Sequence, residues 1–129
     1  MRRLLTRKRI ALVIDDDRKA QSTIGSTFWR LGWIKPVLVK RGAEALRLLQ
    51  DLSQSFDVIV LDQNLPKMTG LELLATLKTI DRYVPPVIML TGNPDPAVER
   101  QARELGAEFL TKNDLSEENL GKLLDQLLG

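Results

Sequence analysis

The chain has 129 residues, of which 43% are apolar and 28% charged, so its size and composition fit one packed domain and exclude a largely disordered chain. It contains no cysteine and no histidine, which excludes disulfides, thiolate metal sites and histidine-based catalysis and leaves oxygen ligands for any metal ion. Five of its 19 basic side chains precede the first predicted strand: Arg2, Arg3, Arg7, Lys8 and Arg9. The rest of the chain has 14 basic and 17 acidic side chains. The net charge of +2 therefore does not indicate that the folded part binds nucleic acid.

The N-terminal segment MRRLLTRKR is basic but lacks the apolar core of a signal peptide, and no later run reaches the length of a transmembrane helix. We therefore expect a cytoplasmic protein that does not associate with membranes. We interpret residues 1–8 as a basic N-terminal extension and residues 9–129 as a single domain that does not itself bind nucleic acid.

Five short apolar runs predict buried strands, at residues 10–14, 37–39, 58–61, 87–90 and 109–110. Helices are predicted between and after these runs, because apolar residues recur there at spacings of three and four. The five apolar stripes are Ala20, Ile24, Phe28 and Leu31; Ala45, Leu46, Leu49 and Leu52; Leu71, Leu74 and Leu77; Val98, Ala102 and Leu105; and Leu120, Leu123, Leu124 and Leu127. The alternation predicts an α/β fold, a doubly wound five-stranded parallel sheet in a three-layer α/β/α sandwich with five helices.

Residues that end or begin helices occur where this pattern requires them. Gly32 and Gly106 are predicted to end the first and fourth helices. Ser116 is predicted to cap the fifth helix, ahead of two glutamates. Trp29 and Trp33 flank the end of the first helix, where we expect partial burial rather than ligand stacking.

Polar side chains follow the predicted strands at the edge where such folds carry their functional sites, and those after four of the five strands suggest a site, whereas Lys40 after the second contributes nothing obvious. The side chains that suggest a site are Asp15, Asp16 and Asp17 after the first strand, Asp62 after the third, Thr91 after the fourth and Lys112, one residue late, after the fifth. Clustered carboxylates without histidine or cysteine suit a hard cation, and magnesium takes one or two carboxylates together with water and phosphate oxygens. The sequence therefore predicts a magnesium site at this edge of the sheet.

Asp62 is the candidate nucleophile, because a carboxylate can form an aspartyl phosphate when a metal ion screens its charge and that of the incoming phosphoryl group. The apolar run 58–61 should fix this residue at the mouth of the sheet. Lys112 is then expected to hold one phosphoryl oxygen, and Thr91 to donate a hydrogen bond to another. Each residue alone has a structural explanation, and Asp17 is expected to cap the first helix, so it is their joint placement that indicates a site.

Four segments, ALVIDDD, VIVLDQNLPKMTGLELL, VIMLTGN and GAEFLTKND, agree in order and spacing with the motifs of one family. Through them the chain resembles the receiver domain of bacterial response regulators in two-component signalling, of the chemotaxis-regulator type, from residue 9 to residue 128. The resemblance implies a flavodoxin-like strand order, 2-1-3-4-5. It also implies that the chain is a signalling domain and not an enzyme. Such a domain catalyses only its own phosphorylation and dephosphorylation.

The resemblance implies a ligand set for the metal ion and the identity of the phosphorylated residue. Asp62 would be the phosphoacceptor. Magnesium would be bound by Asp16, Asp62 and the main-chain carbonyl of Asn64, with Asp15 acting mainly through water.

The resemblance further implies that Thr91 and Lys112 hold the phosphoryl group and that Phe109 is an aromatic switch residue that follows the movement of Thr91. Two residues depart from the family. Asn113 replaces the proline that usually follows the lysine, often after a cis bond, so the local loop is expected to differ. Phe109 replaces a more frequent tyrosine and lacks its hydroxyl, and packing in the core is an equally open role for it.

The phosphoryl donor implied by the resemblance is a phosphohistidine on a sensor histidine kinase or a phosphotransfer protein. Phosphorylation would shift an existing equilibrium in the fourth and fifth βα units and change a protein-interaction surface. The changed surface would be recognised by a downstream effector protein or by an output domain missing from this chain. Formation of a homodimer on phosphorylation is a further alternative.

Three other functions compete with this prediction. An Asp-nucleophile phosphatase of the haloacid dehalogenase kind requires a second aspartate two residues after the nucleophile, where this chain has Asn64. A flavin- or nucleotide-binding module on the same fold requires a glycine-rich phosphate loop after the first strand, where acidic residues occur instead. A degenerate receiver, which binds partners without phosphorylation, is disfavoured because the acidic pair, Asp62, Thr91 and Lys112 are all present.

Overall fold

The structure, a computed structural model, describes residues 8–51, 53–80 and 83–129. Residues 1–7 of the predicted extension and Leu52 of the second apolar stripe lie outside the described residues. Within the described ranges, five parallel strands form one sheet in the order β2-β1-β3-β4-β5. They are β1 (Ala11–Ile14), β2 (Val37–Val39), β3 (Val58–Asp62), β4 (Val87–Thr91) and β5 (Glu108–Thr111). The predicted fold class and strand order are confirmed, and every predicted run agrees with its strand to within one residue at each end.

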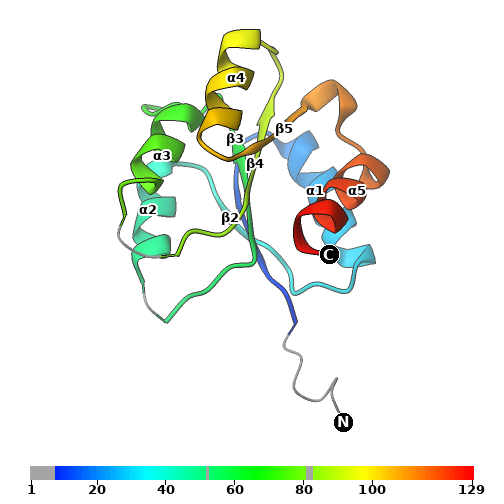
Figure 1. The fold of residues 1–129 in the computed structure, drawn as a ribbon. Coiled ribbons are helices and arrows are strands. Elements are labelled where there is room, and N and C mark those ends of the chain that lie inside the picture. Colours follow the sequence, from blue (N-terminus) through cyan, green and yellow to red (C-terminus); the bar gives the residue numbers. More distant parts are fainter. Residues whose placement is uncertain (1–7, 52, 81–82) are drawn as a thin grey trace.

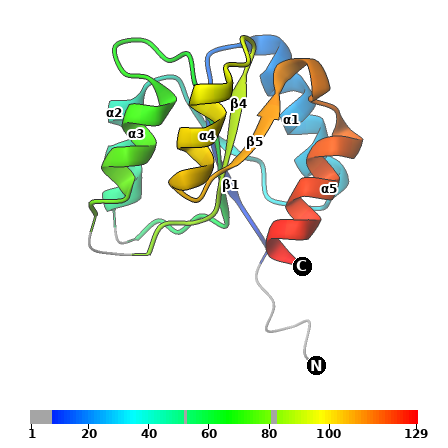
Figure 2. The ribbon, with the colours of Figure 1, turned by 45° about the horizontal axis from the view of Figure 1, so that its top comes forward.

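Helices cover both faces of the sheet (Figure 1). In the part of the chain that the structure describes they are α1 (Arg18–Arg30), α2 (Gly42–Gln50), α3 (Gly70–Leu77), α4 (Pro96–Glu104) and α5 (Glu117–Leu128), with a short 3-10 turn, η2 (Lys112–Asp114), between β5 and α5. Figure 2 shows α2, α3 and α4 on one face and α1 beside α5 on the other. No helix of the described ranges is long and apolar enough to cross a bilayer.

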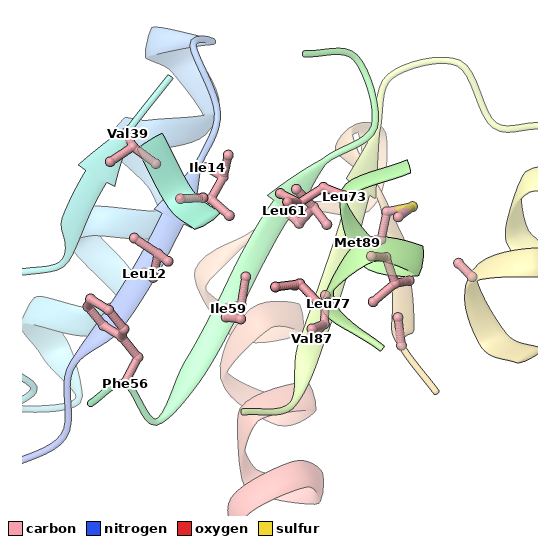
Figure 3. Close-up of a cluster of buried hydrophobic side chains, with 14 of the residues drawn as sticks. Leu12, Ile14, Val39, Phe56, Ile59, Leu61, Leu73, Leu77, Val87 and Met89 are labelled. Carbon is pink, nitrogen blue, oxygen red and sulfur yellow. The ribbon is translucent and has the colours of Figure 1, made fainter. Parts of the chain in front are cut away.

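The two faces of the sheet carry separate hydrophobic cores, because successive side chains of a strand point to opposite faces. On the face of α2, α3 and α4, Leu12 and Ile14 of β1 pack with side chains of β3, β4 and α3 (Figure 3). On the face of α1 and α5, Ala11 and Val13 pack in a second cluster that contains Phe28. Since β1, β3 and β4 are buried on both faces, they appear in the sequence as continuous apolar runs.

The predicted helix ends are confirmed. The Asp17 side chain accepts two backbone hydrogen bonds at the start of α1, and the Ser116 side chain accepts one at the start of α5. Gly32 and Gly106 follow α1 and α4 with φ angles of 76° and 88°, a left-handed conformation that glycine adopts without a Cβ penalty. Asp17 and Ser116 thus begin their helices at the carboxyl edge of the sheet, whereas Gly32 and Gly106 end theirs at the opposite edge.

Three apolar side chains that the sequence predicted to be at least partly buried are exposed: Trp29 by 83%, Leu31 by 48% and Leu38 by 47%. Trp29 comes directly after Phe28, which fills the buried face of α1, so it is turned about 100° away from the core. Leu31 is the C-cap residue, beyond the last packed turn of α1. Leu38 lies on β2, an edge strand that the helices cover incompletely. Trp33, in contrast, is partly buried as predicted, with its ring centroid 4.7 Å from that of Phe28.

Candidate functional site

Three carboxylates meet at the carboxyl ends of β1 and β3. These strands are neighbours, with Ile14 of β1 paired with Leu61 of β3, so the next residues, Asp15 and Asp62, emerge at the same edge. Asp15 is fully buried and Asp62 is 2% exposed, whereas Asp16 is exposed. One oxygen of each of the three lies within 4.8 Å of the other two. The acidic residues found in the sequence therefore share one pocket, which we call the acidic pocket.

The ammonium group of Lys112 lies in the acidic pocket. Lys112 follows β5 at the start of η2, on the far side of β4 from the carboxylates, so its long side chain spans the end of β4. Its Nζ lies 3.0 Å from Oδ2 of Asp17, 3.2 Å from Oδ2 of Asp62 and 3.4 Å from Oδ2 of Asp15. One cation thus partly offsets several negative charges and leaves the pocket attractive to a second cation.

Asp15 is buried and incompletely hydrogen-bonded. Its Oδ1 accepts a hydrogen bond of 2.8 Å from the N–H of Asp17, but its Oδ2 accepts none from any described residue, although Nζ of Lys112 is 3.4 Å away. Burial raises the pKa of Asp15 to about 6, and the charge of Asp62 acts in the same direction. A buried carboxylate with a spare oxygen is a suitable ligand for a cation.

Asp17 and Lys112 form the shortest ion pair of the pocket, at 3.0 Å. Burial alone would lower the pKa of Lys112, but its hydrogen bond to Asp17 and the charges of Asp15 and Asp62 outweigh burial and raise this pKa. The same hydrogen bond lowers the pKa of Asp17. Lys112 therefore keeps its proton at neutral pH and acts as a fixed positive charge. The sequence analysis predicted Asp17 only as a helix cap and missed this second role, although a third acid after the strand was a visible signal.

Replacing Asp15 by asparagine is expected to stabilise the metal-free protein at pH 7.5. The pKa of about 6 in the folded state exceeds the value of about 3.9 in an unfolded chain, so the contribution of this group to stability is lost as the pH rises from about 4 through 6. Asparagine removes that loss, which is on the order of 1 to 3 kcal/mol, or several degrees in Tm. Thermal unfolding in EDTA at pH 4.5 and pH 7.5 measures it. An equal change at both pH values would contradict the raised pKa.

Thr91 ends β4 beside the pocket and is 2% exposed. Its hydroxyl donates a hydrogen bond to the carbonyl of Asn93 at 3.3 Å and accepts one from the N–H of Asn93 at 3.2 Å, so it is held toward the loop that leads to α4. Phe109 pairs with Met89 across β5 and β4 and is 9% exposed, inside the core under α2, α3 and α4. Core packing, one of the two roles predicted for Phe109, is therefore observed.

Two asparagines that were singled out in the sequence lie in the loops of the site. Asn64 is exposed, and its N–H donates a hydrogen bond of 3.2 Å to Oδ1 of Asp62. Asn113 lies inside η2, and no cis peptide bond occurs among the described residues, so the bond that follows Lys112 is trans. The Thr111 side chain caps this turn, and Lys112 is thus presented by an ordinary 3-10 turn.

The start of α3 contains a residue that the sequence analysis missed, Gly70. A Cβ atom on Gly70 would lie 2.6 Å from the carbonyl oxygen of Asp62 and 2.9 Å from Cα of Gln63, so the first turn of α3 packs directly against the backbone of Asp62. The N–H of Gly70 donates a hydrogen bond of 2.9 Å to the carbonyl of Gln63. The signal was a glycine directly after the helix cap, Thr69, a position where capping alone does not require glycine.

Gly70→Ala is therefore expected to destabilise the protein by about 1 to 3 kcal/mol, because a Cβ in contact with backbone atoms forces the loop away from β3. Gly25→Ala in the middle of α1 is the matched control, since a Cβ there meets nothing within 4 Å and should be neutral or stabilising. Chemical denaturation of the two variants measures the difference in their free energies of unfolding. Equal stabilities would show that the close packing of Gly70 against the backbone of Asp62 does not exclude a Cβ at this position.

The fold and the site together define a doubly wound α/β domain with a buried acidic pocket and a lysine at the carboxyl edge of its sheet. The chain belongs to the response regulator receiver domain family, whose model matches residues 11–125, and the family predicted from the sequence is confirmed. It is similar to the Chemotaxis protein CheY homolog of Campylobacter jejuni, with 29% identity over 119 residues that cover 92% of this chain and 91% of the relative.

Solved structures agree with this assignment. The chemotaxis response regulator CheY4 of Vibrio cholerae matches with a TM-score of 0.81 and 29% identity, covering 95% of this chain and all of that one. The receiver domain of the Francisella response regulator 1452 matches with a TM-score of 0.78 and 30% identity, covering 93% of this chain and 96% of that one. The similarity thus extends over nearly the whole chain.

Proposed function

We propose that this receiver domain accepts a phosphoryl group on Asp62 from a phosphohistidine, in a magnesium-dependent reaction. One observation carries the proposal: the buried Asp62 carboxylate lies 3.2 Å from the Lys112 ammonium group, in a pocket that it shares with Asp15 and Asp16. A carboxylate nucleophile, a fixed cation and oxygen ligands are the groups that phosphoryl transfer to a side chain requires.

Asp62 supplies the nucleophilic oxygen. The N–H of Asn64 holds its Oδ1, and Lys112 faces its Oδ2. Attack on phosphorus forms an acyl phosphate while the bond from phosphorus to the donor imidazole breaks. Lys112 then stabilises the charge of one phosphoryl oxygen, and the Thr91 hydroxyl exchanges its contact with Asn93 for a hydrogen bond to another.

The residues of the acidic pocket fit a magnesium ion. All donors are oxygens, which magnesium prefers, and Oδ2 of Asp15 is a buried oxygen without a hydrogen-bond partner among the described residues. Asp16, Asp62 and the main-chain carbonyl of Asn64 would be the protein ligands, with Asp15 acting mainly through water. When bound, the ion would screen the negative charges that meet as the phosphoryl group approaches Asp62.

Phosphorylation would be read out through α4 and β5. Withdrawal of the Thr91 hydroxyl from the loop before α4 would bias this region toward a second arrangement, with Phe109 as the switch residue. In this proposal a sensor histidine kinase or phosphotransfer protein is the donor, and a downstream effector or output domain is the recipient. It assigns residues 9–129 to the receiver domain, residues 1–8 to a basic extension and the protein to the cytoplasm.

The test is to incubate the purified chain with magnesium and a small acyl phosphate and to measure its intact mass. We expect the mass of one phosphoryl group to be added, the adduct to survive mild acid and be lost in base, and EDTA to prevent its formation. Unmodified protein, under conditions that phosphorylate a known receiver, would refute the proposal and favour an interaction module that works without phosphorylation.

A further inference from the structure

A second surface, formed by α1 and β2, lies outside the acidic pocket, although one of its lining residues, Gln21, donates a hydrogen bond to the main-chain carbonyl of Asp15. It is a groove of about 360 Å³ whose apolar lining residues include Gly25 and Trp29 of α1, Leu38 of β2, and Trp33 and Pro36 of the connection between them. Lys35 is its charged lining residue. We call it the α1–β2 groove.

The groove exists because two helices do not cover five strands. Strands spaced about 4.8 Å apart occupy roughly 24 Å of width, whereas two helices of about 10 Å each leave an outer strand partly open. Val13 of β1 lies in the core under α1 and α5, but its register partner on β2, Leu38, is 47% exposed. An apolar side chain therefore forms an open floor at the edge of the sheet.

The walls of the groove present two tryptophans. Gly25 lies one turn before Trp29, and a Cβ there would meet nothing within 4 Å, so the space beside the 83% exposed Trp29 ring is open. The Trp33 ring is held by Phe28, at 4.7 Å between centroids, and by the Arg9 guanidinium, 5.9 Å from the ring centroid. The groove thus has one exposed and one partly buried tryptophan beside an open apolar floor, and tryptophan is among the residues that most often anchor a partner protein.

The charges around the groove are positive. Lys35 lines the groove, and the exposed Lys40 follows β2 directly, two residues after Leu38. Arg18 lies two helical turns before Gly25 and so on the same side of α1. No acidic side chain lines the groove among the described residues. A second copy of this chain would bring like charges together, and the hollow shape suits inserted side chains better than a flat lipid surface.

We propose that the α1–β2 groove docks an acidic amphipathic segment of a partner protein, with apolar side chains seated between Trp29 and Leu38 and carboxylates beside Lys35. None of its lining residues belongs to the acidic pocket, so this proposal does not rest on the proposed phosphorylation.

The two tryptophans allow a direct test, because they are the only ones in the chain and both line the groove. The probe is a three-turn helical peptide with glutamates on one face and leucine and phenylalanine on the other, added to labelled protein while the two indole N–H signals are followed by NMR. We expect both signals to shift saturably, and a matched peptide with lysine in place of every glutamate to bind several times more weakly.

Lys35→Glu should weaken binding of the acidic peptide by about two- to fivefold, which is the effect of one exposed charge contact. The same substitution should strengthen binding of the lysine peptide. Lys122→Glu on α5 is the matched control, since it makes the same change of charge outside the groove and should leave both affinities unchanged.

Three results would overturn the proposal. One is the absence of a saturable shift with the acidic peptide, or equal binding of both peptides. Another is a shift caused by phosphatidylserine-containing vesicles and not by peptides, which would assign the groove to a membrane surface. The third is a concentration-dependent shift without peptide, accompanied by dimer in sedimentation, which would assign it to a second copy of the chain.

Discussion

Asp62→Asn is expected to abolish phosphoryl transfer to this chain. The asparagine side chain has nearly the same size and retains an oxygen that can accept the hydrogen bond from the N–H of Asn64, so the loop after β3 should keep its conformation. It lacks the nucleophilic carboxylate that forms the bond to phosphorus. With magnesium and a small acyl phosphate, the intact mass of the variant should therefore stay unchanged while the wild type gains one phosphoryl group.

Asp125→Asn on the exposed side of α5 is the matched control, because it makes the same change of charge and mass far from the acidic pocket. This variant should be phosphorylated like the wild type. If Asp62→Asn were instead phosphorylated at the wild-type rate, the acceptor would be another carboxylate, and mass analysis of proteolytic fragments would locate it.

The sheet was predictable from the sequence because its central strands are buried on both faces, so β1, β3 and β4 contain almost no polar residues. The exposure of Trp29 and Leu38 was not predictable in the same way. It depends on which strand lies at the edge of the sheet and on how far α1 and α5 extend across it, and these are properties of the packed fold rather than of a local pattern.

The acidic pocket was predictable to the extent that backbone topology determines it. The carboxyl ends of parallel strands meet at one edge, so Asp15 and Asp62 had to lie close together once the strands were assigned. The ion pair of Asp17 with Lys112 and the contact of Gly70 with the Asp62 carbonyl depend on loop geometry and on side-chain reach, which residue spacing does not encode. The roles of these residues in phosphoryl transfer stay predictions.

Two cations, the Lys112 ammonium group and the proposed magnesium ion, would compete for the same carboxylates of the acidic pocket. The Lys112 ammonium group pairs with Asp15, Asp17 and Asp62 at once. The carboxylates of Asp15 and Asp62 are also among those proposed to attract magnesium. In the proposed reaction, Lys112 would therefore oppose metal binding by like-charge repulsion and would assist the transfer of the phosphoryl group.

Lys112→Met is expected to slow phosphorylation but to strengthen magnesium binding. Methionine approximates the length of the lysine stem without its charge, so phosphorylation at saturating magnesium should slow by about 10²- to 10³-fold, the loss typical of one removed electrostatic contact in a transition state. Magnesium should bind more tightly, because a competing cation is gone. Time courses of intact mass measure the rate, and the rise of Tm with magnesium concentration measures the affinity.

Lys122→Met on α5 is the matched control for Lys112→Met, and it should leave both measurements unchanged. A variant that is merely misfolded would lose phosphorylation and magnesium binding together, so only opposite changes support the assignment. An unchanged phosphorylation rate in Lys112→Met would mean that the ammonium group, although 3.2 Å from Asp62, balances the charge of the resting carboxylates and does not act on the transferred group.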